Sequence, residues 1–315
     1  MKKTIEVSTR GTFLSLRDSR LAIKREKELL GHIPFEDIGL MILDSTGISL
    51  SSGVLKALAD SGGGLLACDD DHIPCGIFLP IFGNSLLSER LRFQVNASKP
   101  LQKNIWAKVI QAKIRNQAAV LGEMADKTYL YKVAQAVRSG DEGHHESRAA
   151  QFYWPRVLAG VLADKSQKFR RLREGKAPNG LLNYGYTVLR AAMARAICAA
   201  GLQPSFGIHH TNKYSGFCLA DDLMEPYRPF VDKAVVALVA DGHDQVNQET
   251  KPKLLGVLGE DVWLCGEATR LGVALETTAS SLARCFEEQV KNGLSAPQAV
   301  KAIKLPEFPS VKPCQ

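Results

Sequence analysis

The sequence predicts an α+β protein, with a β-rich N-terminal domain followed by a larger domain that is nearly all α-helical. Between residues 4 and 80, short apolar and β-branched runs alternate with glycines and Asp-rich turns, as in a set of strands. From residue 101 onward, apolar residues recur at three- and four-residue spacing, which is typical of amphipathic helices. The length of 315 residues also favours two domains, each able to bury its own core.

In the N-terminal region we expect strands at Ile5 to Val7 and at residues 12–16, 21–24, 38–43, 65–68 and 77–79. One helix is expected over residues 51–60, and the three glycines at 62–64 that follow it indicate a turn. The predicted β-rich domain, a dimerisation domain in the interpretation reached below, covers residues 1–85.

A linker is expected over residues 86–100, and the helical domain over residues 101–304. Its predicted helices cover residues 101–121, 129–139, 146–164, 181–200, 222–239 and 280–292. The remaining tail, residues 305–315, contains three prolines, which prevent a helix from continuing and predict an extended or disordered end.

Composition narrows the class of protein. Forty Lys and Arg against 33 Asp and Glu give a formal charge of +7, which modestly favours a polyanionic partner. The seven scattered cysteines form no C-x-x-C pair and indicate reduced thiols. Glu6 and Arg10 interrupt the place of a signal-peptide core, and no apolar run is long enough to cross a membrane. We therefore expect a soluble, cytoplasmic protein.

Residues 207–229 combine two histidines, three carboxylates and an arginine, and His144, His145 and Glu146 form a second cluster. Carboxylates with an imidazole are the ligands of a divalent-metal site, and a nearby guanidinium can hold a phosphate. A helix that starts at Glu146 would place this acid above an apolar stripe of alanines and Tyr153. Such an acid faces a pocket, or it only complements the helix dipole.

Asp222 lies three residues before Glu225 and Asp221 lies four before it, so Glu225 can share a helical face with either aspartate. Pro226 fits best just inside a helix, which predicts that one aspartate is an N-cap and that the other remains free with Glu225. Pro229 further predicts that the helix restarts or kinks here.

His209 and His210 are expected on a loop where adjacent side chains face opposite ways, so only one can readily be a ligand. A carboxylate-rich site with one imidazole suits Mg²⁺ or Mn²⁺ better than zinc. Cys68, His72 and Cys75 form a less favoured zinc pattern that lacks a fourth ligand.

A basic run follows the helix of Glu146 and is a candidate for contact with a DNA backbone. A solvated loop is the alternative interpretation of this run. A weaker candidate is the stretch 101–115, with Lys103, Lys108, Lys113 and Arg115. The basic residues of the first run are Lys165, Lys168, Arg170, Arg171, Arg173 and Lys176.

Four segments resemble the CRISPR-associated endonuclease and integrase of spacer acquisition, the first member of the Cas series, in its type II form. They are Glu146-Ser-Arg-Ala-Ala-Gln-Phe-Tyr-Trp154, Asn179-Gly-Leu-Leu-Asn-Tyr-Gly-Tyr186, Gly207-Ile-His-His210 and Leu219-Ala-Asp-Asp-Leu-Met-Glu-Pro-Tyr-Arg-Pro229. Segment 68–80 of the β-rich region also resembles this family, so the likeness covers nearly the whole chain. Ser147 departs from the glycine that many members carry, without removing a ligand.

The resemblance implies that Glu146, His210 and Glu225 are catalytic metal ligands for Mg²⁺ or Mn²⁺. It places Asp221, Asp222 and His209 around them and Arg228, with the basic run, on DNA. It also implies a homodimer joined through its β domains, and a small companion adaptation protein that bridges two dimers around captured double-stranded DNA.

The implied reaction is a transesterification that joins 3′-hydroxyl ends of captured DNA to the CRISPR repeat, with hydrolysis when water is the nucleophile. Two alternatives remain. One is a non-catalytic DNA-binding scaffold whose carboxylates only cap helices and form ion pairs. The other is a phosphohydrolase of small molecules, which the extended basic run disfavours.

Overall fold

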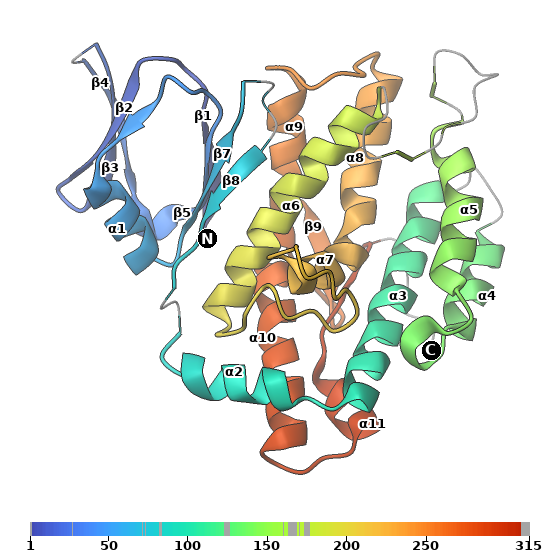
Figure 1. Ribbon diagram of the computed structural model, residues 1–315. Helices are drawn as coiled ribbons and strands as arrows, with labels where there is room; N and C mark the ends of the chain where they lie inside the picture. The colour runs from blue at the N-terminus through green and yellow to red at the C-terminus, as the bar shows by residue number, and fades with distance from the viewer. Residues whose placement is uncertain are drawn as a thin grey trace.

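The structure is a computed structural model that describes residues 2–26, 28–70, 72, 74–81, 84–122, 127–159, 161–162, 169, 171–172 and 177–309. Its N-terminal part contains two four-stranded sheets, drawn in blue and cyan in Figure 1. The first, in the order β1-β5-β7-β8, is parallel except for β8. It comprises β1 (Lys3–Val7), β5 (Ile38–Leu43), β7 (Gly64–Cys68) and β8 (Pro74–Phe78).

The second sheet has the order β4-β3-β2-β6, and its strands β4, β3 and β2 are antiparallel neighbours. It comprises β2 (Thr12–Arg17), β3 (Arg20–Arg25), β4 (Glu28–Pro34) and β6 (Ser49–Leu50). The predicted strands and the predicted helix, now α1 (Ser52–Asp60), are confirmed. The sequence did not reveal β4, because its side chains are mostly exposed and show no alternation, or the two-residue β6.

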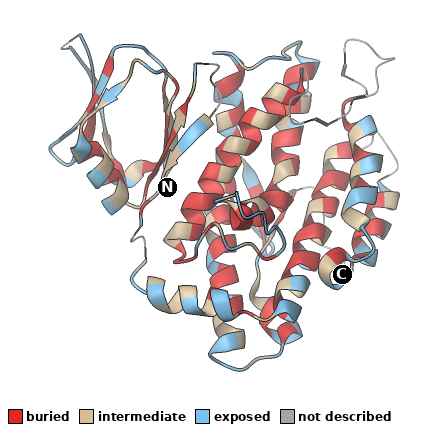
Figure 2. Ribbon diagram, in the orientation of Figure 1, coloured by how far each residue is buried: buried red, intermediate tan, exposed pale blue. Residues whose placement is uncertain are grey.

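The predicted linker contains a helix, α2 (Leu87–Asn96), that was not expected. The next helix, α3 (Lys99–Leu121), begins where Ser98 accepts a hydrogen bond from the amide of Leu101 at 3.3 Å. It is buried along much of its length and passes between the other helices (Figures 1 and 2). The remaining helices are α4 (Thr128–Ala136), α5 (His145–Val157), α6 (Asn179–Ala199), α7 (Cys218–Met224), α8 (Arg228–Ala240), α9 (Thr250–Gly256), α10 (Leu271–Val290) and α11 (Ala296–Ala299).

Several predicted helix ends were wrong. Helix α5 ends at Val157, two residues after Pro155, so it does not reach residue 164. The predicted helix over 222–239 is two helices, α7 and α8, joined by the 3₁₀ turn η3 (Glu225–Tyr227). Helix α10 starts at Leu271, nine residues before the predicted start at 280. The short α9 was not predicted.

The helical part also holds a small sheet that the sequence analysis missed. Its order is β10-β9-β11, with β9 (Asp261–Leu264), β10 (Glu267–Arg270) and β11 (Pro306–Glu307). Strand β11 belongs to the predicted tail and pairs with β9, which agrees with the extended alternative for this part of the tail. Residues 310–315 lie outside the described residues.

The two parts of the molecule share a core. Leu40, Ile42 and Leu66 of the first sheet are buried in the same apolar cluster as the helices. Asp44 and Lys251 form a buried ion pair across this boundary, 2.5 Å apart. The division at residue 85 therefore stays a prediction. Within the described residues, no helix combines the length and the apolar character that a membrane span requires.

Candidate active site

Lys113 of α3 lies between two carboxylates that are far apart in the sequence. Its Nζ is 2.6 Å from Oε1 of Glu146 and 2.6 Å from Oε2 of Glu225. The side chain of Glu225 is 7% exposed, that of Lys113 13% and that of Glu146 32%. The fold thus brings together the two acids that the sequence analysis selected, and Glu146 is the more exposed of the two.

Glu146 is positioned by the start of α5. Asp141 accepts hydrogen bonds from the amides of His145 at 2.9 Å and of Glu146 at 3.0 Å, and so caps the helix. The same carboxylate contacts Nδ1 of His145 at 3.0 Å, so that imidazole faces Asp141. The backbone of His144 is left-handed, which turns the chain into the helix. The glutamate is free of the capping role.

Glu225 is positioned by the break between α7 and α8. The predicted restart near Pro226 and Pro229 is confirmed by the 3₁₀ turn that starts at Glu225. The predicted aspartate N-cap was wrong, because both aspartates lie inside α7. Arg228 donates from Nε to Oε1 of Glu225 at 2.8 Å. Oε2 of Glu225 is buried and receives no hydrogen bond of good geometry, although the Lys113 ammonium is close to it.

Charge pairing decides the ionisation of this site. Burial alone would raise the pKa of Glu225, but the nearby charges of Arg228 and Lys113 outweigh burial and lower it to about 2. Burial would lower the pKa of Lys113, but the two glutamates outweigh it and raise that pKa. Glu225 and Lys113 therefore both carry charge at neutral pH.

Asp222 organises the loop that carries the histidines. Its fully buried carboxylate accepts the amides of Ile208 at 2.7 Å, His209 at 2.9 Å and His210 at 3.2 Å. Nδ1 of His210 lies 2.5 Å from Oδ1 of the same carboxylate. The hydrogen bond to Asp222 raises the pKa of His210. Because Asp222 occupies Nδ1, the Nε2 atom of His210 is the one left for a ligand.

This tight loop needs a glycine at its start. A Cβ atom on Gly207 would come 2.3 Å from the backbone oxygen of His210 and 2.9 Å from Oδ2 of Asp222. No side chain fits there without moving the backbone. Gly207 therefore allows three successive amides to converge on one carboxylate.

The two adjacent histidines have different surroundings. The ring of His209 stacks on the buried Trp106 of α3, with centroids 4.1 Å apart and planes 1° from parallel. The ring of His210 meets Trp106 edge-on at 5.7 Å and lines a neighbouring cleft. This difference favours His210 over His209 as the residue that acts in the site.

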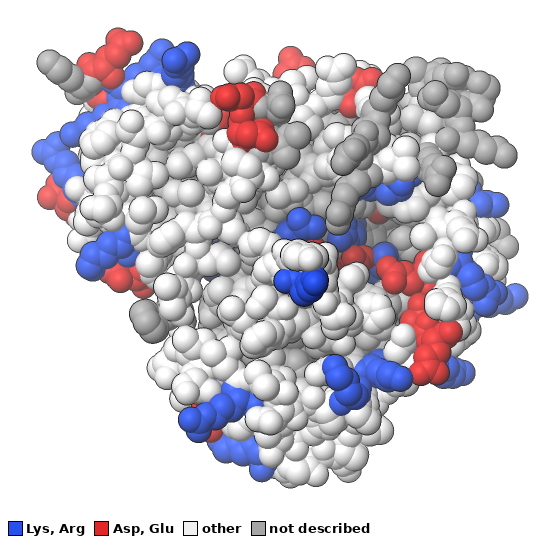
Figure 3. Space-filling model, viewed as in Figure 1, with Lys and Arg blue, Asp and Glu red and all other residues white. Residues whose placement is uncertain are grey.

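The cleft beside His210 has a volume of about 1270 Å³ and three arginines in its wall, Arg171, Arg190 and Arg228. Arg190 pairs with Asp221 at 2.6 Å, and both side chains line the cleft. Arg171 donates to Asn183 at 2.7 Å, and Arg228 lies over the ring of Tyr186 at 4.6 Å. Basic and acidic side chains gather around a hollow near the centre of the face in Figure 3.

The predicted DNA-contact residues are only partly described. Arg171 lies in the cleft wall, and Arg228 contacts Glu225 as well as the cleft. Outside the described residues lie Lys165, Lys168, Arg170, Arg173 and Lys176.

The donor set suits a hard divalent cation, although its three predicted ligands are not gathered tightly. Within the described ranges, no three His, Cys, Asp or Glu side chains cluster closely enough to hold a metal ion, and this includes Cys68, His72 and Cys75. His72 instead contacts Asp44 at 3.1 Å. Glu146 and Glu225, however, already share one positive charge, the ammonium of Lys113, and Oε2 of Glu225 lacks a hydrogen bond.

Three contributors to this site were not identified from the sequence. Lys113 was noted only within a weak basic stretch, and its value depends on a fold that brings Glu146 and Glu225 to it. Asp141 and Trp106 also act through long-range or irregular contacts. A search for an acid four to five residues before the Glu146 helix could have found Asp141.

Comparison with known proteins gives a family match over most of the chain. Residues 5–260 match the family model described as CRISPR associated protein Cas1. A CRISPR-associated endonuclease Cas1 from Neisseria meningitidis is 33% identical over 97% of this chain and 96% of its own length. A second, from Pyrobaculum aerophilum, is 30% identical over 70% of this chain and 77% of its own.

Solved structures share the fold. A casposase bound to its integration product has a TM-score of 0.74 at 20% identity, over 91% of both chains. A CAS1 protein from Thermotoga maritima has a TM-score of 0.72 at 18% identity, over 90% of this chain and 97% of the other.

Proposed function

The chain belongs to the Cas1 family of CRISPR-associated endonucleases, and we propose that Glu146, His210 and Glu225 bind the divalent cation with which it cuts and joins DNA. The observation that carries this proposal is that the ammonium group of Lys113 lies between the two glutamates. Lys113 occupies that place at 2.6 Å from each carboxylate. Two acids held so close to one point require a positive charge there.

The surroundings of each ligand support the assignment. Arg228 and Lys113 keep Glu225 ionised, as a metal ligand must be. Asp222 fixes the ring of His210 through Nδ1 and directs Nε2 away from itself, in the manner of a carboxylate that orients a metal-bound imidazole. Mg²⁺ and Mn²⁺ both accept such a set of oxygen and nitrogen ligands.

When bound, the cation would supply charge neutralisation at the phosphate and activation of the oxygen nucleophile. The remaining work falls to the side chains. Arg171, Arg190 and Arg228 make the cleft attractive to a phosphodiester. Trp106 and Asp222 hold the histidine loop in place from two sides. The glutamates stay fixed on α5 and at the start of η3.

In the proposed joining reaction, the 3′-hydroxyl oxygen of a captured duplex attacks a phosphorus of the CRISPR repeat. A new oxygen–phosphorus bond forms as the original one breaks, the attacking hydroxyl loses its proton, and the departing 3′-oxygen gains one. No covalent bond to the protein is needed. With water as the nucleophile, the same site hydrolyses a phosphodiester.

The proposed assembly is a homodimer that works with a small companion adaptation protein on double-stranded DNA. Two solved structures with this fold, described as a Cas6-RT-Cas1–Cas2 complex and a TtCas1–DNA complex, support a companion protein and DNA as partners. An exposed apolar set on the sheet of β2 and β4 supports pairing through the β-rich part. Its members are Phe13, Leu16, Leu29 and Leu30.

The test is strand joining and cutting by the purified chain, with its companion protein, a duplex with free 3′-hydroxyls and a plasmid that carries a leader and repeat. Wild type is compared with Glu225→Gln and His210→Ala in Mg²⁺, in Mn²⁺ and in chelator. His209→Ala is the matched control because it removes the adjacent imidazole. We expect metal-dependent products from wild type and the control, and loss of both products in the two site variants.

The scaffold alternative makes the opposite prediction. A protein whose carboxylates serve only in ion pairs would bind DNA and form neither product with any cation. Direct Mn²⁺ binding, followed by electron paramagnetic resonance, separates the two without relying on turnover. Wild type should bind Mn²⁺ and Glu225→Gln should bind it much more weakly, while a scaffold would show no difference.

A further inference from the structure

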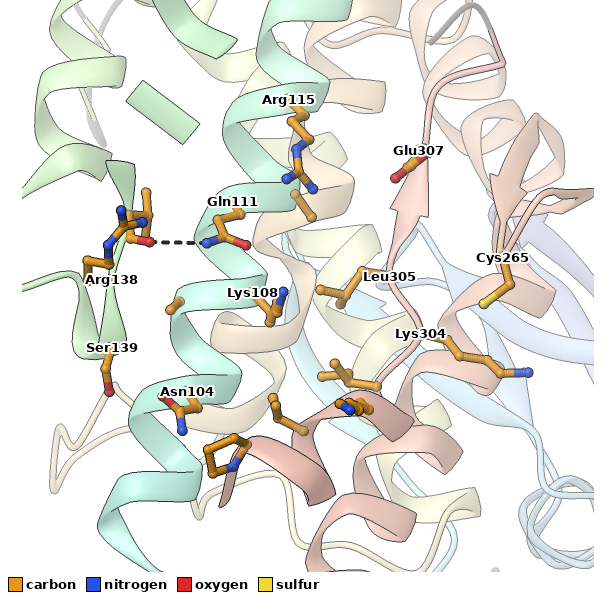
Figure 4. A pocket seen from close by; sticks show the side chains of 17 residues that line it. Asn104, Lys108, Gln111, Arg115, Arg138, Ser139, Cys265, Lys304, Leu305 and Glu307 are labelled. Carbon is orange, nitrogen blue, oxygen red and sulfur yellow. Dashed lines mark hydrogen bonds between the residues drawn. The ribbon is translucent and has the colours of Figure 1, made fainter. Parts of the chain in front are cut away.

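A second concave site lies on α3, away from the cleft. It has a volume of about 700 Å³ and is walled by α3, the segment around Arg138, the 3₁₀ turn η5 (Val300–Ala302) and the residues that lead into β11. Figure 4 shows Lys108, Gln111 and Arg115 on α3, with Arg138 on one side and Lys304 and Glu307 on the other. The hydrogen bond from Gln111 to the carbonyl of Val137, 3.1 Å, ties two of these walls together.

This pocket is strongly basic. Five of its lining side chains are cationic and only Glu307 is acidic. In the described part of the chain, none of the five forms an ion pair, and neither does Glu307. The cationic residues are Lys108, Arg115, Arg138, Lys301 and Lys304.

The pocket lies on the face of α3 opposite to the active site. An α-helix turns about 100° per residue, so Gln111 and Arg115, each two positions from Lys113, point about 200° away from it. Lys108 points about 140° away by the same geometry. A ligand that fills this pocket therefore approaches α3 from a different side than a phosphate in the cleft of His210.

The lining indicates the class of ligand. Its walls hold aliphatic side chains such as Val137, Ile303 and Leu305 but no Phe, Tyr or Trp among the described lining residues. The bases of single-stranded nucleic acids bind by stacking on aromatic rings, so a site without aromatic rings does not select bases. Lys and Arg side chains on three separate segments, α3, the segment around Arg138 and residues 301–304, suit the regularly repeated charges of a phosphate backbone, which is recognised without reading sequence.

We propose that this pocket binds the sugar–phosphate backbone of a duplex DNA segment that lies outside the active-site cleft. The inference rests on the proposed function for its ligand, since DNA joining involves more DNA than a cleft of about 1270 Å³ can hold. Lys108 and Lys304 are exposed at two separate walls and make the direct phosphate contacts. They act in binding and positioning, and contact no reacting atom.

The test measures duplex affinity in the absence of catalysis. The full chain carries Glu146→Gln, the buffer contains chelator, and a labelled long duplex is titrated at four salt concentrations. The double variant Lys108→Gln with Lys304→Gln is compared with Lys3→Gln and Lys132→Gln combined. The control removes the same charge from two exposed lysines elsewhere that form no described ion pair.

We expect the pocket variant to lose at least about tenfold in affinity at low salt and to lower the slope of log affinity against log salt by about 2, because two phosphate contacts disappear. The control should change the slope by much less. An equal loss in both variants would mean a general charge effect and would overturn the proposal.

An acidic peptide of matched charge is titrated in a further arm. If the pocket variant loses this peptide but keeps its affinity for duplex, the pocket receives an acidic protein segment, and the DNA proposal is wrong. Because the assay runs without metal and without a product, it stays informative if strand joining fails. Loss of affinity in the pocket variant alongside an inactive wild type would retain the pocket and reject the proposed function.

Discussion

The two faces of helix α3 handle charge in opposite ways. On one face, Lys113 is almost buried and pairs with Glu146 and Glu225, each at 2.6 Å. On the other, Lys108 and Arg115 line a pocket and form no ion pair in the described chain. The same helix thus presents a neutralised charge cluster on one side and a net positive surface on the other.

The difference teaches how each face is held and what it can do. On the paired face, the cations Lys113 and Arg228 offset the hydration that the buried carboxylate of Glu225 loses, so the charges there are fixed by their partners. Exposed lysines remain hydrated at little cost and lose little if their ligand is absent. The paired face suits chemistry at one point, and the unpaired face suits reversible attachment of a polyanion.

The largest expected effect comes from breaking the paired face. Glu146→Gln keeps the shape of the side chain but removes its charge, so a cation loses one of its two carboxylates. We expect cutting and joining to fall by more than about 10²-fold, beyond the loss usual for residues that only support metal ligands. Product formation is measured at saturating Mg²⁺, with circular dichroism to check folding. Activity near wild type would contradict the assignment of Glu146.

Asp222→Asn should have the next largest effect, about 10- to 100-fold on activity, because this carboxylate orients His210 and accepts three loop amides. The amide keeps an acceptor but loses the charge that fixes the imidazole. The distinguishing measurement is the nitrogen-15 spectrum of the His210 ring. An unchanged tautomer at Nδ1 would show that Asp222 does not orient this ring.

Asp232 tests whether cation pairing is what keeps Glu225 charged. Asp232 is also buried, but it accepts hydrogen bonds from the neutral hydroxyls of Tyr153 and Tyr186. Burial raises its pKa to about 6, despite those bonds and nearby cations. A folded-state pKa above the unfolded value means stability that is present in acid and lost as the pH rises from about 4 to about 6.

Asp232→Asn should therefore remove a stability change on the order of 3 kcal/mol across that window, which is the shift converted at 1.36 kcal/mol per pH unit. Urea unfolding of wild type and variant at pH 4 and pH 7 measures this difference. If the stabilities of wild type and variant respond to pH in parallel, the pKa of Asp232 is not raised, and burial without a directly paired cation does not have the expected effect.

The smallest effect should come from His209→Ala. This ring stacks on Trp106, and a stacked pair of rings contributes about 1 kcal/mol. We expect a loss of that order in the free energy of unfolding, with activity within a few-fold of wild type. A loss of activity as large as that of His210→Ala would mean that both histidines serve the site.

Much of this arrangement was accessible from the sequence. Alternation and glycine punctuation predicted the core strands, and Pro226 with Pro229 predicted the break that places Glu225. Family resemblance selected Glu146, His210 and Glu225, and the structure brings the two glutamates to one ammonium. Their role as ligands, like the type II form, stays a prediction.

Other features depended on contacts that local patterns do not encode. Lys113 looked like one of several surface lysines, because its partners lie 33 and 112 positions further along the chain. Asp222 looked like a helix cap, but it lies inside α7 and accepts amides from a loop more than ten residues earlier. The basic pocket joins α3 to residues 297–307, which span the predicted end of the helical domain and the start of the predicted tail at residue 305.

The most direct test of the contrast between the two faces is one titration with duplex DNA, followed by addition of Mg²⁺. Glu146→Gln and the Lys108→Gln, Lys304→Gln double variant are measured beside wild type for affinity, salt slope and product. We predict that Glu146→Gln binds DNA at least as tightly as wild type and forms no product, while the double variant binds DNA more weakly and with a smaller salt slope. If Glu146→Gln instead loses affinity and the double variant keeps it, the proposed separation of catalysis and DNA binding between the two faces of α3 is wrong.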